Sequence, residues 1–135
     1  MALIDLDHVN IRTARLAEMV QFYGEVLGLR EGPRPGFAMG GAWLYCGERA
    51  VVHLVEVATA PNAPTPQIEH FALTAADLKG FLCKLRDLRV PYHIAIVPDL
   101  ELRQVFLRDP DGNRIEISFQ ADEQADLSDF DGCAA

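Results

Sequence analysis

The chain has 135 residues, and its 12 basic and 20 acidic side chains give a formal net charge of −8 at pH 7. This length fits one compact domain or two fused half-units that share a core, and a hydrophobic content of 50% is ordinary for a globular protein. No cluster of Lys and Arg forms the basic stripe that nucleic acids require, so we expect no nucleic-acid partner.

The cysteines and the apolar segments bear on location. The chain has three cysteines, Cys46, Cys83 and Cys133, and no two of them form a Cys-x-x-Cys motif. This argues against a disulfide scaffold or a zinc ribbon and favours a reducing compartment. No apolar run approaches the ~18 residues of a membrane span, and no basic-then-apolar leader opens the chain. We therefore expect a cytoplasmic protein that does not engage a membrane.

The first half of the chain predicts a strand, a helix and more strands, in that order. A strand is expected near residues 4–12 and a helix near 14–27, where apolar side chains follow the i, i+3, i+4, i+7 spacing of one helical face at Leu16, Met19, Val20 and Tyr23. Strand patterns follow near 41–46 and 50–57, with a short one around Leu29.

The second half repeats this order after a segment rich in proline, residues 58–67, that suits a linker. A strand near 68–73 precedes a helix near 76–89, and strands follow near 92–97, 102–108 and 113–119, the last two joined by a turn at Asp109-Pro110-Asp111-Gly112. Each half is thus predicted to be a βαβββ module, spanning 1–57 and 68–119, and the acidic tail at 120–135 receives no function.

A histidine follows an acidic residue at the start of both copies, in Asp7-His8 and Glu69-His70. Side chains alternate between the two faces of a strand, so His8, with Asn10 and Arg12, should face away from the helix, and so should His70. In the last strand the same alternation puts Glu116 on that face, and in the fourth strand it puts His53 there.

Two neutral imidazoles and a carboxylate suit a divalent ion such as Fe, Mn, Ni, Co or Zn. Each residue also has a simpler interpretation. His53 fits a half-buried imidazole bonded to a neighbour as well as it fits a ligand, and Arg12 fits a solvated cation as well as a clamp for a substrate anion. Trp43, Tyr45 and Phe106 either line a cavity or simply pack.

Three sequence elements together resemble the vicinal oxygen chelate superfamily, which includes glyoxalases, bleomycin-resistance proteins and extradiol dioxygenases. They are the histidine that opens both copies, Phe22-Tyr23 before Leu27-Gly28, and the segment from Arg108-Asp109-Pro110 to Ile115-Glu116. The resemblance implies an α+β fold in which two βαβββ modules form a cupped, mixed and mostly antiparallel sheet with helices on its outer face. It also implies a divalent metal and a homodimer.

The resemblance also assigns roles to individual residues. His8, His70 and Glu116 match the metal ligands of the superfamily, and His53 stands where glyoxalase I proteins carry a glutamate ligand. Apart from the resemblance, the expected chemistry would let Glu116 or His53 accept a substrate proton, and the strand faces would let Asn10, Arg12, Trp43, Tyr45 and Phe106 contact substrate.

The expected function is therefore that of a metal-dependent enzyme of the glyoxalase or dioxygenase type, a lyase, an isomerase or a ring-cleaving dioxygenase. Its substrate would be a small, anionic metabolite with two vicinal oxygens. The alternative is a ligand-binding dimer like the bleomycin-resistance proteins, which binds without a metal and has no catalytic activity.

Overall fold

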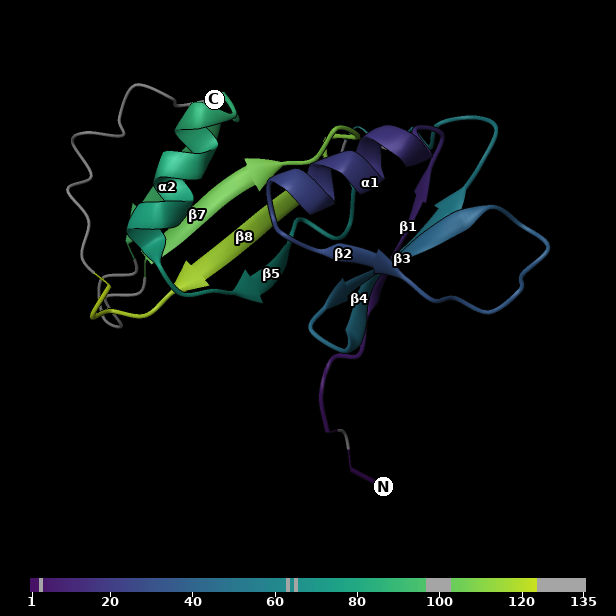
Figure 1. Cartoon of the computed structure of the whole chain (residues 1–135), viewed down its shortest axis with the longest axis horizontal. Coiled ribbons are helices and arrows are strands. Elements are labelled where there is room, and N and C mark those ends of the chain that lie inside the picture. Colours follow the sequence, from purple (N-terminus) through teal and green to yellow (C-terminus); the bar gives the residue numbers. More distant parts are fainter. Residues whose placement is uncertain (3, 63, 65, 97–102, 124–135) are drawn as a thin grey trace. The chain divides into compact units, whose positions relative to one another are not determined.

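The chain forms two compact units, Met1–Pro64 and Thr65–Ala135, in a computed structural model. The structure describes residues 1–2, 4–62, 64, 66–96 and 103–123. Within these residues each unit contains one helix and one four-stranded mixed sheet in the order βαβββ (Figure 1). This confirms the α+β class and the duplicated order of elements that the sequence predicts.

Unit 1 builds its sheet in the order β1-β4-β3-β2. Its first and last strands along the chain are parallel, and the other two pairs are antiparallel. The elements are β1 (Val9–Thr13), α1 (Leu16–Glu25), β2 (Arg30–Gly32), β3 (Gly41–Cys46) and β4 (Arg49–Glu56).

The core of unit 1 lies between α1 and the sheet. Met19 and Tyr23 of α1 are fully buried, and α1 packs against β2, β3 and β4. Leu44, Val52 and Leu54 fill the facing side of the sheet at no more than 1% exposure. Each such aliphatic side chain contributes about 1.5–3 kcal/mol when fully buried, so this apolar face fixes which side of the sheet remains for polar residues.

Unit 2 repeats the arrangement, with the strand order β5-β8-β7-β6. Its elements are β5 (Phe71–Thr74), α2 (Leu78–Asp87), β6 (Tyr92–Ile96), β7 (Arg103–Arg108) and β8 (Arg114–Phe119). Leu78, Leu82 and Leu85 of α2 are fully buried, and the ring centroids of Phe81 and Phe119 lie 5.8 Å apart, which joins α2 to β8.

Parts of the predictions lie outside the described residues. Residues 97 and 102, at two predicted strand ends, belong to this group, as do residues 63 and 65 of the linker and the tail from residue 124 onward.

The histidine-bearing strands begin later than the alternating sequence pattern predicts. Strands were expected from residues 4 and 68, but the ladders begin with the pairs Val9–Val52 and Phe71–Ile115. His8 and His70 therefore lie immediately before β1 and β5. Alternating apolar and polar residues indicate an extended chain, but a β-strand also needs a hydrogen-bonded neighbouring strand. A local sequence pattern does not show where that neighbour begins and ends.

The helices, at 16–25 and 78–87, are also shorter than predicted, and the chain turns before each of them begins. The Thr13 hydroxyl accepts a hydrogen bond from the Arg15 amide at 2.9 Å, so the chain turns before α1 begins. At α2 the Asp77 carboxylate accepts from the Gly80 amide at 3.0 Å. The Glu123 carboxylate, 46 positions along the chain, accepts from the Asp77 and Leu78 amides at 2.8 and 3.2 Å.

A buried carboxylate builds the turn between β7 and β8. Asp109 is 5% exposed, and its Oδ1 accepts from the amides of Asp111 and Asn113 at 3.0 and 2.9 Å. Its Oδ2 accepts from the Asn113 side chain at 2.8 Å, and Gly112 takes a φ of +87° that favours glycine. The Asp-Pro-Asp-Gly-Asn segment therefore sets the hairpin that aligns β7 with β8.

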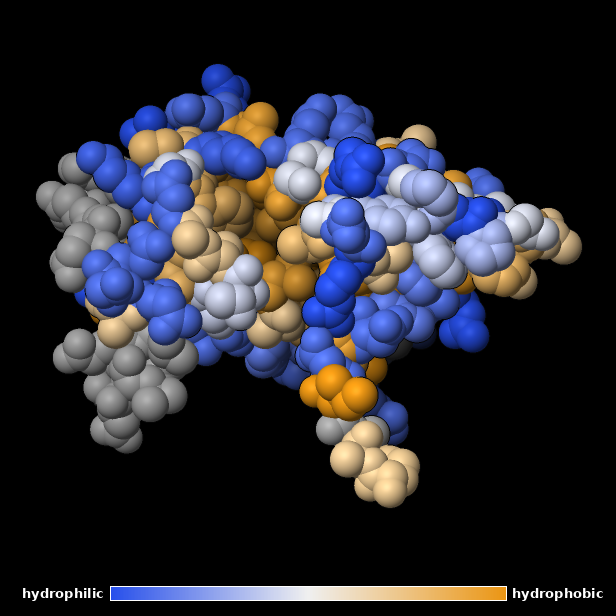
Figure 2. Space-filling view, turned by 60° about the horizontal axis from the view of Figure 1, so that its bottom comes forward, coloured by the Kyte–Doolittle hydropathy of each residue, from blue (hydrophilic) through white to orange (hydrophobic). Residues whose placement is uncertain are grey.

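The surface mixes polar and apolar side chains, as Figure 2 shows for one face. Large apolar side chains that are exposed include Ile4, Leu6, Phe37, Met39, Ile68 and Ile96. Within the described residues, α1 and α2 have ten residues each, and neither is long enough to cross a membrane.

Candidate functional site

The predicted site residues divide between the two units. Unit 1 carries His8, Asn10, Arg12, Trp43, Tyr45 and His53, whereas unit 2 carries His70, Phe106 and Glu116. Among residues 1–2, 4–62, 64, 66–96 and 103–123, no group of three or more His, Cys, Asp or Glu side chains is close enough to hold a metal ion. The structure instead brings the predicted ligands together as one pair in each unit.

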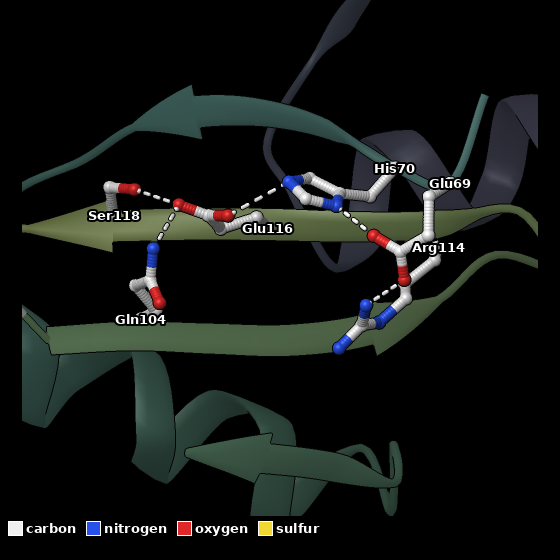
Figure 3. A network of polar contacts seen from close by, with 6 residues as sticks. All are labelled: Glu69, His70, Gln104, Arg114, Glu116 and Ser118. Atoms are coloured by element: carbon white, nitrogen blue, oxygen red, sulfur yellow. Dashed lines mark hydrogen bonds and ion pairs between the residues drawn. The ribbon is translucent and has the colours of Figure 1, made fainter. Parts of the chain in front are cut away.

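In unit 2 the pair is His70 and Glu116 (Figure 3). The His70 Nε2 lies 3.1 Å from the Glu116 Oε2. The second oxygen of Glu116, Oε1, accepts hydrogen bonds from the Gln104 Nε2 at 2.8 Å and from the Ser118 hydroxyl at 2.6 Å. Glu116 is only 7% exposed, Gln104 and Ser118 are half-buried beside it on β7 and β8, and His70, which precedes β5, is exposed.

The other side of the His70 ring is held by an acidic neighbour. The His70 Nδ1 contacts the Glu69 carboxylate, which also forms an ion pair with Arg114 (Figure 3). The hydrogen bond to His70, followed by the contact with Arg114, holds the pKa of Glu69 below its usual range. Because Nδ1 is engaged by a carboxylate, Nε2 is the nitrogen that faces Glu116.

Phe106 completes this cluster from β7. Its ring meets the His70 ring edge-on, with centroids 5.8 Å apart and an interplanar angle of 83°. The Arg114 guanidinium carbon lies 4.2 Å from the centre of the same ring. Phe106 therefore contacts both the imidazole of His70 and the cation of Arg114, the two groups that Glu69 also joins.

In unit 1 the pair is His8 and His53, and their rings are stacked. The ring centroids lie 3.8 Å apart with an interplanar angle of 15°, and Trp43 stacks on the other face of His53 at 4.0 Å and 9°. As in unit 2, an acidic neighbour holds Nδ1 of the first histidine, with the Asp7 Oδ2 2.6 Å from the His8 Nδ1. This hydrogen bond holds the pKa of Asp7 below its usual range.

The surroundings of His53 disfavour its protonated form. The side chain is 8% exposed, and burial followed by the charge of His8 lowers its pKa. Its Nε2 lies 3.1 Å from the Ala50 carbonyl oxygen. When Nε2 carries the proton and donates to this oxygen, Nδ1 keeps the lone pair that a metal or a proton requires.

The strand registers show that the two units place equivalent residues at equivalent positions. In unit 1, Asn10 pairs with His53 and His53 with Trp43; in unit 2, Ala72 pairs with Glu116 and Glu116 with Phe106. His53 is therefore the counterpart of Glu116, and Trp43 is the counterpart of Phe106. Each unit combines an acid–histidine pair with a buried ionisable side chain and an aromatic ring.

The remaining predicted residues differ in their contacts. Asn10 and Arg12 are exposed on β1. The Tyr45 hydroxyl donates to the Pro33 carbonyl, and a Cβ added at Gly32 would come within 2.7 Å of the Tyr45 ring. These contacts place Tyr45 against β2 and give it a role in fixing the start of the connection between β2 and β3.

Sequence reasoning missed the residues that hold the ligand candidates in place, namely Asp7, Glu69, Gln104, Arg114 and Ser118. The acidic residue before each histidine was visible as a duplicated feature, and it identifies the partners of the two Nδ1 atoms. Gln104 and Ser118 are directly paired across β7 and β8. That pairing depends on the register of the two strands, which cannot be derived from the sequence pattern.

Two donor atoms in unit 2, which form an ion pair, are separated by a distance that also occurs between two ligands of one metal ion. Two donors that each lie about 2.0–2.2 Å from one ion are roughly 3.0–3.4 Å apart, and the 3.1 Å between the His70 Nε2 and the Glu116 Oε2 falls in that range. An imidazole whose second nitrogen contacts a carboxylate is also a common arrangement among metal ligands.

Comparisons with known proteins agree with this fold. Residues 5–117 match the Glyoxalase/Bleomycin resistance protein/Dioxygenase superfamily. A protein of Arabidopsis thaliana named Glyoxylase I 4 is 30% identical over 123 residues, which cover 85% of this chain and 70% of that protein.

Two crystal structures show the same fold. A glyoxalase family protein from Bacillus anthracis is 26% identical, with a TM-score of 0.74 over 89% of this chain and 98% of that one. A glyoxylase/bleomycin resistance protein/dioxygenase domain from Frankia sp. EAN1pec is 17% identical, with a TM-score of 0.74 over 91% and 96% of the two chains. With most of its length matched by the family and its fold shared with these structures, the chain belongs to the glyoxalase/bleomycin resistance/dioxygenase, or vicinal oxygen chelate, superfamily.

Proposed function

We propose that this chain is a metal-dependent enzyme of the glyoxalase or dioxygenase type that acts on a small, anionic metabolite with two neighbouring oxygen atoms. The observation that carries the proposal is the 3.1 Å approach of the His70 Nε2 to the Glu116 Oε2, with each side chain held from its far side by other residues. Members of the superfamily generally bind divalent metals, and these two donors suit such an ion.

The proposed ligands are His8, His70 and Glu116, with His53 as a fourth. His8 and His70 would each bind through Nε2, because a carboxylate engages Nδ1 in both. His53 would bind through Nδ1, because its Nε2 faces the Ala50 carbonyl. The equivalence of His53 and Glu116 in the two strand registers supports its inclusion.

A divalent ion at this site would act as a Lewis acid toward the two neighbouring oxygens of the substrate. The residues of the chain would supply the remaining functions. Glu116 or His53 would accept a proton from a substrate carbon, and Arg12 with Asn10 would contact the anionic group of the substrate. Trp43, Tyr45 and Phe106 would provide its apolar contacts.

The first experiment is to measure bound transition metal per chain after purification without chelator. Near-stoichiometric metal is expected in the natural protein and little in His70→Ala and Glu116→Ala. His53→Phe keeps an aromatic ring in the stack but offers no donor atom, and should hold less metal, while His93→Ala, which changes an exposed histidine outside the proposed ligands, should hold the natural amount.

The result has clear consequences either way. Unchanged metal content in both His70→Ala and Glu116→Ala would refute the proposed ligands. Bound iron would direct substrate screens to oxygenase reactions, and nickel, zinc, cobalt or manganese would direct them to isomerase and lyase reactions.

A second candidate is a metal-free ligand-binding dimer, which the ring stack in unit 1 favours. Phe37 lies beside the stack of His8, His53 and Trp43, with its ring tilted by 48° to that of Trp43 and the two centroids 6.3 Å apart, and Phe37 is 48% exposed. Trp43 is the single tryptophan of the chain, so its fluorescence reports on this stack. Quenching by bleomycin in chelator-treated protein, unaffected by His70→Ala, would support this candidate, and sedimentation would test the predicted homodimer.

A further inference from the structure

We infer that Gln104 and Ser118 are positioning residues that hold Glu116 by one oxygen and leave only its Oε2 for a bound ion. The inference rests on the proposed function, because it concerns how one proposed ligand is presented. It assigns two residues to the site that neither the sequence pattern nor the family match singles out.

The first argument is the way the hydrogen bonds are distributed over the Glu116 carboxylate. Both the Gln104 Nε2 and the Ser118 hydroxyl donate to the same oxygen, Oε1, at 2.8 and 2.6 Å, while Oε2 faces the His70 Nε2 at 3.1 Å (Figure 3). Two donors occupy the lone pairs of Oε1. An ion that bound both carboxylate oxygens would have to displace these donors.

The second argument is rigidity. Glu116 is 7% exposed, and Gln104 and Ser118 lie directly opposite each other in the ladder of β7 and β8. Ser118 is two residues from Glu116 on the same strand face, so both donors approach from regular secondary structure rather than from a loop. A side chain held in this way loses little conformational freedom when an ion binds.

The third argument comes from the comparison of the two units. The pair Gln104–Ser118 is two residues along each strand from the pair Phe106–Glu116, and the same step in unit 1 leads from Trp43–His53 to Gly41–Val55. Neither Gly41 nor Val55 has a polar side chain. Unit 2, where the central side chain is the carboxylate of Glu116, therefore has a pair of hydrogen-bond donors at this position. Unit 1, where the central side chain is the stacked imidazole of His53, has no such pair at the equivalent position.

The test is to titrate Zn²⁺ and Co²⁺ into metal-free Gln104→Leu, Ser118→Ala and the double variant. Leucine keeps the approximate volume of glutamine without its donor. Loss of a residue that orients a ligand typically weakens metal binding 10–100-fold, so we expect roughly that change in Kd for the double variant. The visible spectrum of bound Co²⁺ should also change, because a freed Oε1 alters the number and geometry of donor atoms.

Two further variants separate positioning from a general loss of structure. Ser118→Thr retains the hydroxyl and should bind as the natural protein does. Gln21→Ala removes a similar bond between glutamine and glutamate, from Gln21 to Glu25 at 3.0 Å on the exposed face of α1, and should leave both Kd and spectrum unchanged. Should the double variant fail to fold, the same comparison is made with the single variants against Ser118→Thr.

The outcomes separate this inference from the proposed function. If the natural protein binds metal, His70→Ala abolishes binding, and the donor variants match the natural protein in both Kd and Co²⁺ spectrum, only the positioning role is overturned. If the natural protein binds neither ion and also purifies without iron, manganese or nickel, the metal-dependent function and the inference fall together; if it purifies with one of these, the same titrations are made with that ion. Weaker binding with an altered spectrum, restored by Ser118→Thr, establishes the positioning role.

Discussion

At the scale of single residues, the chain uses the same device twice. An acidic residue directly before a histidine contacts its Nδ1, in Asp7–His8 and in Glu69–His70, and so determines which ring nitrogen faces away. Such a carboxylate fixes the tautomer and raises the basicity of the remaining nitrogen. The duplication gives both acidic residues the same contact with the histidine that follows them.

Replacing one of these acidic residues should weaken metal binding without removing it. We expect Glu69→Gln to raise the Kd for Zn²⁺ by about 10–100-fold, because an amide orients and polarises the imidazole less strongly than a carboxylate does. Titration calorimetry on metal-free protein measures the change. Glu18→Gln is the matched control, since Glu18 also follows the pattern of an exposed glutamate paired with an arginine, Arg15. Equal Kd values in Glu69→Gln and the natural protein would contradict this role.

At the scale of elements, α2 depends on a residue far along the chain. Asp77, directly before α2, takes a left-handed conformation with φ of +67° and accepts from the Gly80 amide, while the Glu123 carboxylate accepts from two amides at the same end. A carboxylate at a helix N-terminus satisfies amides that have no partner in the helix and also interacts favourably with its dipole. Glu123 lies in the first part of the predicted acidic tail, so this part of the tail caps the N-terminus of α2.

Removing this carboxylate should destabilise the protein. We expect Glu123→Ala to lower the free energy of unfolding by about 1–2 kcal/mol, because two backbone amides lose their charged acceptor. Urea unfolding followed by circular dichroism is the measurement. Asp122→Ala, a neighbouring exposed carboxylate, should change the free energy by less than about 0.5 kcal/mol. Unfolding of both variants at the same urea concentration would show that the Glu123 contact does not contribute to stability.

At the scale of the whole molecule, each unit has its own sheet, its own helix and its own buried apolar face. Val105 and Ile115 are fully buried in unit 2, as Leu44 and Val52 are in unit 1. Each core lies on one face of its sheet, and the polar clusters lie outside these cores. A ligand that binds only the folded state will then add to the existing stability.

A divalent ion should therefore raise the midpoint of thermal unfolding. At a free concentration of 100 times Kd, binding contributes about 2.7 kcal/mol, which for a chain of this size is a rise of roughly 8–15 °C. Scanning calorimetry with and without Zn²⁺ measures the rise, and excess chelator should reverse it. His70→Ala should show almost no rise, and a rise equal to that of the natural protein would place the ion elsewhere.

Much of the fold was predictable because it depends on local patterns. The helical faces at Met19 and Tyr23 and at Leu82 and Leu85 are buried as their spacing predicts, and the Asp109 turn closes the hairpin at its predicted position. Strand and helix ends were less predictable. His8 and His70 lie just before the first hydrogen-bonded pairs of their sheets. The sequence pattern did not show this, because the alternation continues beyond those pairs.

The sequence by itself determined the duplicated βαβββ order, the apolar faces and the polar residues opposite them, since each of these is written in the spacing of neighbouring side chains. Only the tertiary structure decided the partners: Glu116 with His70, Gln104 and Ser118, and His53 with His8 and Trp43. The reason is that strand order and register join residues far apart in the chain, and local periodicity carries no information about which strands pair.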